Sequence, residues 1–117
     1  MADIGDIIEL IVDIPERNLR AGMQGAIVHL HDSEFYEIEF TDESGETRDF
    51  LSLGLDQFIV VWRAETHEWV STAEKVTAIV ARLPQEAAEE AFDFARFLSV
   101  RKRQSPTPES SVVDTKR

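Results

Sequence analysis

The amino-acid sequence predicts an α+β protein that is mainly β, with a small five-stranded barrel followed by a C-terminal αα-hairpin arm. Two observations carry this prediction. Roughly the first sixty residues hold short runs rich in Ile, Val and Phe between tight turns, and from residue 71 onward the apolar spacing becomes helical. Because no helix comes early enough to cover the apolar face of these strands, we expect the sheet to close on itself.

Five strand-like segments make up the β part. They are residues 6–14, 26–31, 35–40, 47–53 and 58–62. The third segment alternates most clearly, because Tyr36, Ile38 and Phe40 share one face and two glutamates share the other. Gly45 lies in the turn that follows, where we expect it to take a positive φ.

Two amphipathic helices are predicted after the strands. Ser71 and Glu74 have the spacing of a capping box, which marks the start of the first helix. An apolar stripe follows at helical spacing, formed by Val76, Ile79, Val80 and Leu83. Pro84 ends this helix and suits the first position of the next one.

The predicted organisation is therefore a barrel domain, an arm and a tail. The barrel domain spans 1–69 and the helical hairpin arm spans 70–103. The segment 104–117 is rich in Ser, Thr and Pro and poor in apolar residues, so we expect a flexible tail there.

The charge is unevenly distributed. The chain of 117 residues has a formal net charge of −11, and residues 1–69 alone carry 16 acidic and 4 basic side chains, a net of −12. An acidic barrel repels phosphate backbones, so we expect no nucleic-acid binding by the barrel. The same surface would either keep the protein soluble or attract a basic partner.

Other features of the sequence exclude several kinds of site and segment. The chain has no cysteine, which excludes disulfides, thiolate zinc sites and cysteine nucleophiles, and which fits a cytoplasmic protein. No apolar run approaches 18 residues, so we expect no membrane span. The N-terminal residues lack the basic and apolar regions of a secretory signal.

Several histidines and tryptophans are candidates for a site. His29 and His31 project from one strand toward the face that carries Glu37 and Glu39, where they could bind zinc or simply form cross-strand charge pairs. We favour the charge pairs. His67 has no nucleophile near it in sequence, and we expect neither an enzyme nor a metal or other cofactor.

Trp62 and Trp69 bracket a short polar segment between the barrel and the arm. We expect them to pin the helical arm onto the barrel, because each tryptophan can bury a large apolar area. Binding of a partner is the alternative role for the pair.

The second helix carries more apolar surface than one neighbour can cover. Ala91, Phe94 and Leu98 form one face, while Phe92 and Phe97 lie on opposite flanks. The apolar arc is about 220° wide, against about 100° for a helix that packs on a single neighbour. The surplus could bury against the chain's own barrel, a second copy or another protein. We expect Phe92 to pack within the chain and Phe97 to face a separate one.

Residues 4–62 resemble a family of small bacterial domains, domain of unknown function 4926. The resemblance rests on Pro15, Glu16, Leu19, Gly22, Gly25, Ile27, residues 37–40, Asp42, Gly45, Thr47 and residues 53–57. It implies an SH3-like β-barrel in which Gly22 and Gly25 shape the turn into the second strand. It implies no catalytic residues.

Residues 73–103 resemble a second bacterial family, domain of unknown function 2281, whose short helical members are classed as antitoxin-like. The matching positions are Glu74, Lys75, Leu83, Pro84, Glu90, Asp93, Phe94, Phe97 and Leu98, and residues 85–87 depart from the pattern. The resemblance implies a protein-interaction module that neutralises a partner toxin, and a basic toxin would suit the acidic barrel. The alternative is a structural protein that self-associates through the same helices. The partner-binding residues we expect are Phe92, Phe94, Phe97, Leu98 and Arg101.

Overall fold

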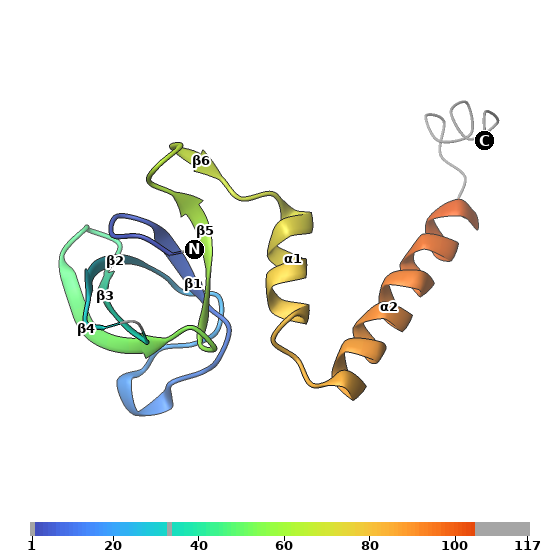
Figure 1. Ribbon diagram of the computed structural model, residues 1–117, viewed down its shortest axis with the longest axis horizontal. Coiled ribbons are helices and arrows are strands. Elements are labelled where there is room, and N and C mark those ends of the chain that lie inside the picture. Colours follow the sequence, from blue (N-terminus) through green and yellow to red (C-terminus); the bar gives the residue numbers. More distant parts are fainter. Residues whose placement is uncertain (1, 33, 105–117) are drawn as a thin grey trace. The chain divides into compact units, whose positions relative to one another are not determined.

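A computed structural model describes residues 2–32 and 34–104 of the chain (Figure 1). The chain divides into two compact units, Met1–Arg82 and Leu83–Arg117. The first unit contains a β-sheet, a short 3₁₀ helix and one α-helix, and the described part of the second is a single long α-helix. Each unit is described below by itself.

The first unit is built on one antiparallel sheet of six strands. The strands are β1 (Ile7–Leu10), β2 (Gln24–Leu30), β3 (Phe35–Thr41), β4 (Thr47–Gly54), β5 (Phe58–Arg63) and β6 (Glu68–Trp69). Their order across the sheet is β4-β3-β2-β1-β5-β6. Consecutive strands pair from β1 to β4, and β5 pairs with β6. β1 also pairs with β5, which joins the two groups. The α+β class that was predicted from the sequence is confirmed.

The closed five-stranded barrel is not confirmed. A sixth short strand extends the sheet beyond β5, and in the described residues β4 and β6 form two open edges. The strands nevertheless curve strongly (Figure 1). Closure was expected because no helix comes early enough in the chain to cover the strands, but helix α1 (Thr72–Val80) packs beside β5.

Side chains connect the β4 edge to the turn after β1. This turn contains a short 3₁₀ helix, η1 (Pro15–Arg17). Arg17 donates two hydrogen bonds to the carboxylate of Asp49, at 2.6 and 2.8 Å, and a third to the carbonyl of Phe50 at 3.2 Å. From β4, Arg48 donates to the carbonyl of Asn18 at 2.8 Å. The Arg17 guanidinium therefore hydrogen-bonds a backbone carbonyl of β4, an edge strand to which another strand could otherwise pair.

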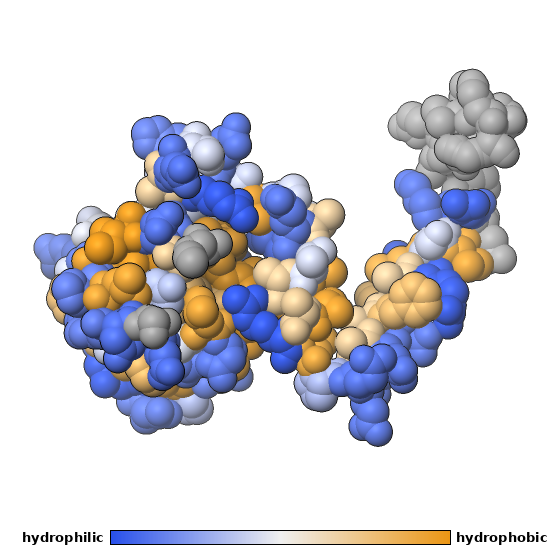
Figure 2. All heavy atoms as spheres, in the orientation of Figure 1, coloured by the Kyte–Doolittle hydropathy of each residue, from blue (hydrophilic) through white to orange (hydrophobic). Residues whose placement is uncertain are grey.

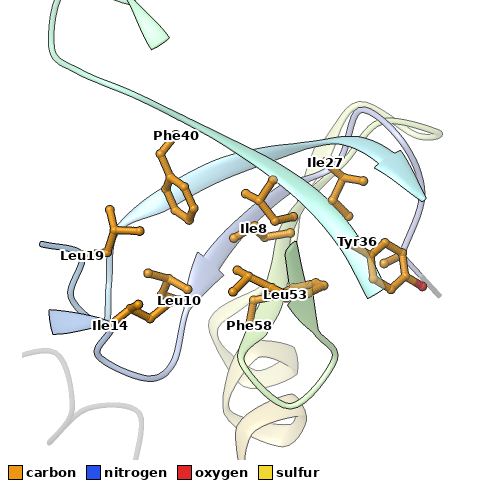
Figure 3. Close-up of a cluster of buried hydrophobic side chains, with 11 residues drawn as sticks. Ile8, Leu10, Ile14, Leu19, Ile27, Tyr36, Phe40, Leu53 and Phe58 are labelled. Carbon is orange, nitrogen blue, oxygen red and sulfur yellow. The ribbon is translucent and has the colours of Figure 1, made fainter. Parts of the chain in front are cut away.

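The core lies on the inner face of this curved sheet (Figure 3). Tyr36, Ile38 and Phe40 of β3 are all buried, as their alternation predicted, and they meet Ile8 and Phe58 from the central strands. Tyr36 and Phe58 pack edge to face, with ring centroids 5.6 Å apart. Such an arrangement suits aromatic quadrupoles and adds to the apolar burial.

Two glycines are required by the geometry of this sheet. A Cβ at Gly25 would lie 2.7 Å from Cγ2 of Ile38, so a larger residue in β2 would push β3 away from the core. Gly45 takes φ +89° in the turn between β3 and β4, which confirms the positive φ expected there. The carboxylate of Asp42 accepts hydrogen bonds from the backbone of Ser44 and Glu46 and fixes the same turn.

Helix α1 begins with the predicted capping box. The Ser71 hydroxyl accepts a hydrogen bond from the backbone N–H of Glu74 at 3.1 Å, and the Glu74 carboxylate accepts from the backbone N–H of Ser71 at 3.4 Å. The helix is nine residues long and belongs to the same compact unit as the sheet. The boundary between the two compact units therefore lies after Arg82. The boundary predicted at 69/70 remains a prediction about independent folding.

The second unit contains helix α2 (Gln85–Gln104). It begins directly after Pro84, whose carbonyl accepts a hydrogen bond from the backbone N–H of Ala88 at 2.9 Å. Glu86 lies in the first turn and three cations lie in the last, which suits the helix dipole at both ends. Gln104, assigned to the tail from sequence, ends the helix, and the rest of that segment lies outside the described residues. Neither α1 nor α2 has the length and apolar character needed to cross a membrane.

Candidate protein-binding helix

Helix α2 exposes its large apolar side chains. Phe92, Phe94 and Phe97 are exposed by 63, 61 and 55 % respectively, and Val100 is also exposed. None of the side chains at positions 85–103 is buried, although four are half-buried: Ala87, Ala88, Ala91 and Leu98. Apolar surface along α2 is visible in Figure 2. Full burial of each phenylalanine would contribute roughly 2–3 kcal/mol, so this surface favours a contact.

The phenylalanines form two separate clusters. Phe94 and Phe97 stack on one another with ring centroids 6.1 Å apart, and the Arg101 guanidinium lies 5.9 Å from the Phe97 ring. Phe92 lies on another side of the helix, where the Arg96 guanidinium is 4.9 Å from its ring. Each cluster therefore combines an aromatic side chain with a cation above its face.

The structure brings together four of the five residues predicted to bind a partner. Phe94 and Leu98 lie on one face, with Phe97 and Arg101 beside them, as successive turns of a helix require. Phe92 lies apart from them. Phe92 has the largest exposed fraction of the three phenylalanines, and its packing within the chain stays a prediction.

The charges of α2 are segregated along its length. All four acidic residues lie in the first half, at Glu86, Glu89, Glu90 and Asp93. All four basic residues lie in the second half, at Arg96, Arg101, Lys102 and Arg103. The halves meet at an ion pair of 2.6 Å between Asp93 and Arg96. Both partners are largely exposed, so this pair adds little stability by itself. The segregation is visible in the sequence, because it needs only the order of the charged residues along one helix.

His29 of β2 and His31 just after it both lie near Glu37 of β3. His29 lies opposite Glu37 in the β2–β3 register, and Nε2 of His31 is 2.9 Å from Oε1 of Glu37. The two imidazole rings are 5.0 Å apart, edge to face. Within residues 2–32 and 34–104, no three potential ligands are grouped closely enough to hold a metal ion.

The two tryptophans pair with each other across the β5–β6 hairpin. Trp62 lies opposite Trp69 with ring centroids 6.4 Å apart, and the His67 ring stacks on Trp62 at 5.5 Å. His67 can close the hairpin because it adopts φ 59°, which sharpens the turn. Trp69 is exposed by 63 %, so within the first unit it does not pin α1 onto the sheet as expected.

The strand registers extend this pair into a row across the outer face of the sheet. The row runs Trp69, Trp62, Ile7, Ala26, Glu39 and Phe50, one residue from each strand. Sequence reasoning missed it, because the row depends on which residues lie opposite one another. The small side chain of Ala26 and the charged side chain of Glu39 separate Phe50 from the other large apolar side chains of the row. The apolar surface of the row is therefore less continuous than that of α2.

A hollow of about 360 Å³ lies in the first unit, where α1 meets the sheet. Its polar side chains come from Tyr36, Arg63, Glu74 and Arg82, and the remainder of its lining is apolar. Arg82 already donates to the backbone carbonyls of Leu55 and Ala78, at 2.8 and 2.6 Å. The lining contains no serine, threonine or histidine.

Comparison with known families supports one of the two resemblances. Residues 4–60 match the model of a family described as "Domain of unknown function (DUF4926)". The matched region begins before β1, ends within β5, and includes neither α1 nor α2. The similarity of the helical segment to domain of unknown function 2281 is not shown. No curated protein matches the chain, and no solved structure matches it.

Proposed function

We propose that this protein is a non-enzymatic protein-interaction module that binds its partner through α2. The observation that carries the proposal is the exposure of Phe92, Phe94 and Phe97 on one helix. Aromatic side chains ringed by charged residues are typical of binding hot spots. Arg101 beside Phe97 and Arg96 beside Phe92 supply such charges here.

The most specific form of this proposal is an antitoxin that neutralises a partner toxin. Two features support it: the resemblance of residues 73–103 to an antitoxin-like family, and the net charge of −12 over residues 1–69. A toxin that cleaves nucleic acid needs a cationic active site, and an acidic partner is attracted to such a site. The alternative is a structural protein that self-associates through the same helix.

In this proposal the first unit is a scaffold of the SH3-like type. The support is the family match over residues 4–60 together with the strong curvature of the sheet. The side-chain bonds between Arg17 and Asp49 would then take the place of a closing ladder. We place the activity in the cytoplasm, and the absence of cysteine from the chain is in keeping with this.

The test is co-expression with the product of the adjacent gene. If the proposal is right, the full chain restores growth to cells that make that product, and the two proteins purify together. Replacing Phe92, Phe94 and Phe97 together by alanine should abolish both effects. Alanine has the highest helix propensity, so the helix itself should persist.

The matched control replaces Phe35 and Phe50 by alanine. Both are exposed phenylalanines of the sheet, at 46 and 48 %, so the control removes similar apolar surface away from α2. It should restore growth like the unchanged chain. Rescue by the triple α2 variant would refute the assignment of the binding surface. A failure of the unchanged chain to bind or rescue would refute the antitoxin form.

A further inference from the structure

Charge and side-chain size both change along α2 in the same direction. The acidic half, residues 85–93, places the small side chains of Ala87 and Ala91 on the central apolar face. The basic half, residues 94–104, places the large side chains of Phe94 and Leu98 on that face. The helix thus has one small, acidic half and one large, basic half, and each half complements the other.

We propose that α2 binds α2 of a second copy of this chain in an antiparallel pair. This inference rests on the proposed function in one respect, namely that α2 is a protein-binding helix, and it identifies the occupant of the central face. In an antiparallel pair the acidic half of each helix lies along the basic half of the other. The alanines of one copy then face the larger side chains of its partner, which fills the interface evenly.

The flank of the apolar face supports the same orientation. Glu86, Glu90, Phe97 and Arg101 lie along one flank at helical spacing. A two-fold axis perpendicular to antiparallel helices brings this flank against the same flank of the second copy. Glu90 of each copy then lies near Arg101 of the other, at the rim of the Phe97 contact.

A parallel pair would place like charges side by side. Arg101, Lys102 and Arg103 of two copies would meet at one end, and four acidic residues from each copy would meet at the other. Like charges repel at such positions, whereas opposite charges attract, so the distribution selects against the parallel arrangement. The helix is 20 residues long, about 30 Å, which provides more than five turns for the contact.

The antiparallel pair leaves one aromatic cluster uncovered. Phe92, with Arg96 above its ring, lies away from the face that holds Ala91, Phe94 and Leu98. A heterologous partner can bind there without separating the pair. Self-association and partner binding can therefore be tested separately, because Phe92 contributes only to the contact with the heterologous partner.

Sedimentation equilibrium of the full chain tests the pair directly. We expect a reversible dimer, and the double variant Phe94→Ala/Leu98→Ala should raise its dissociation constant about tenfold or more. Phe92→Ala is the matched control on the same helix and should leave that constant unchanged. A full chain that stays monomeric at high concentration would overturn the inference, as would a dimer that the double variant does not weaken. Neither outcome bears on growth rescue by the toxin partner.

Charge reversal tests the orientation. Glu90→Arg and Arg101→Glu should each weaken the dimer, by about fivefold, because each places like charges together across the antiparallel pair. The variant that carries both changes should recover the original affinity, since the opposite charges face one another again. Strengthening by either single change would indicate a parallel pair and would overturn the inference.

Disulfide trapping gives an independent reading of the orientation, because the chain has no cysteine of its own. A mixture of Glu90→Cys chains and Arg101→Cys chains should oxidise mainly to the mixed disulfide. Disulfides that link two Glu90→Cys chains or two Arg101→Cys chains in preference to the mixed product would overturn the antiparallel arrangement.

Discussion

The sheet buries some of its aromatic side chains, whereas helix α2 leaves all three of its phenylalanines exposed. In the sheet, Phe40 and Phe58 are exposed by only 2 and 1 %. On α2, no phenylalanine is exposed by less than 55 %. The sheet curves around its own apolar face and buries it, whereas the described part of the second unit is a single helix. The comparison indicates that the sheet is stabilised from within, and it is the basis of our proposal that α2 packs on a surface supplied by another chain.

Truncating one phenylalanine in each region is the strongest way to break this comparison. Phe40→Ala opens a cavity in the core and should lower the free energy of unfolding by about 3–5 kcal/mol. Phe94→Ala removes a side chain of the same size from α2. In dilute protein it should leave the unfolding midpoint of the sheet unchanged. Urea denaturation of both variants measures the difference, and equal losses would show that α2 is part of the core.

Truncating the chain sharpens the boundary between the two regions. A fragment of residues 1–82 keeps α1 and should unfold at the same urea concentration as the dilute full chain. A fragment of residues 1–69 should still unfold cooperatively, as predicted from sequence. It should be less stable by about 1.5–3 kcal/mol, because it loses the buried side chain of Val70. An unfolded 1–69 fragment would show that α1 completes the core.

The sequence predicted the local structure of the sheet more fully than its overall topology. Alternation identified Tyr36, Ile38 and Phe40 as core because a strand's two faces are visible in a period of two. The short strand β6 was missed, since its two residues form a pair only through the register with β5. Closure of the sheet was also expected, but no local pattern encodes which edges stay open.

The candidate site was predicted in a similar way. The positions of Phe94, Phe97 and Leu98 around the helix follow from 100° per residue and needed no structure. The helical period alone could not predict whether Phe92 packs within the chain. Burial depends on a neighbouring surface, and the period does not identify that neighbour. The pairing of Trp62 with Trp69 likewise depends on the turn at His67, whose positive φ is unusual for a residue other than glycine.

A buried carboxylate provides a smaller test of the sheet's internal order. Asp6 is exposed by 2 %, and its two carboxylate oxygens accept hydrogen bonds from the backbone N–H groups of Asp3 and Ala64, at 2.9 and 2.8 Å. An asparagine has only one acceptor oxygen, so Asp6→Asn should lower the free energy of unfolding by about 1–3 kcal/mol. Thermal unfolding of the variant measures this loss. An unchanged midpoint would mean that these bonds contribute nothing to the sheet.

The smallest expected effect is the acid sensitivity of the β4 edge. The hydrogen bonds from Arg17 hold the pKa of Asp49 below its usual range, although partial desolvation opposes them. A carboxylate with a lowered pKa in the folded state stabilises that state above the unfolded pKa, about 3.9, and stops doing so as the pH falls through the folded value. Asp49→Asn should therefore lower the urea midpoint slightly at pH 7. The difference should vanish well below pH 4, and a difference that persists there would exclude the ion pair as its cause.

Hydrogen exchange of the full chain over a series of concentrations tests the central claim most directly. Backbone amides exchange slowly only where a stable structure holds them, so exchange reports on each region separately. Our account predicts that the protection of β1 to β5 is the same at every concentration, while that of α2 rises as the protein becomes more concentrated and the helices pair. Full protection of α2 in the most dilute sample, unchanged on concentration, would contradict the claim that this helix is completed by another chain.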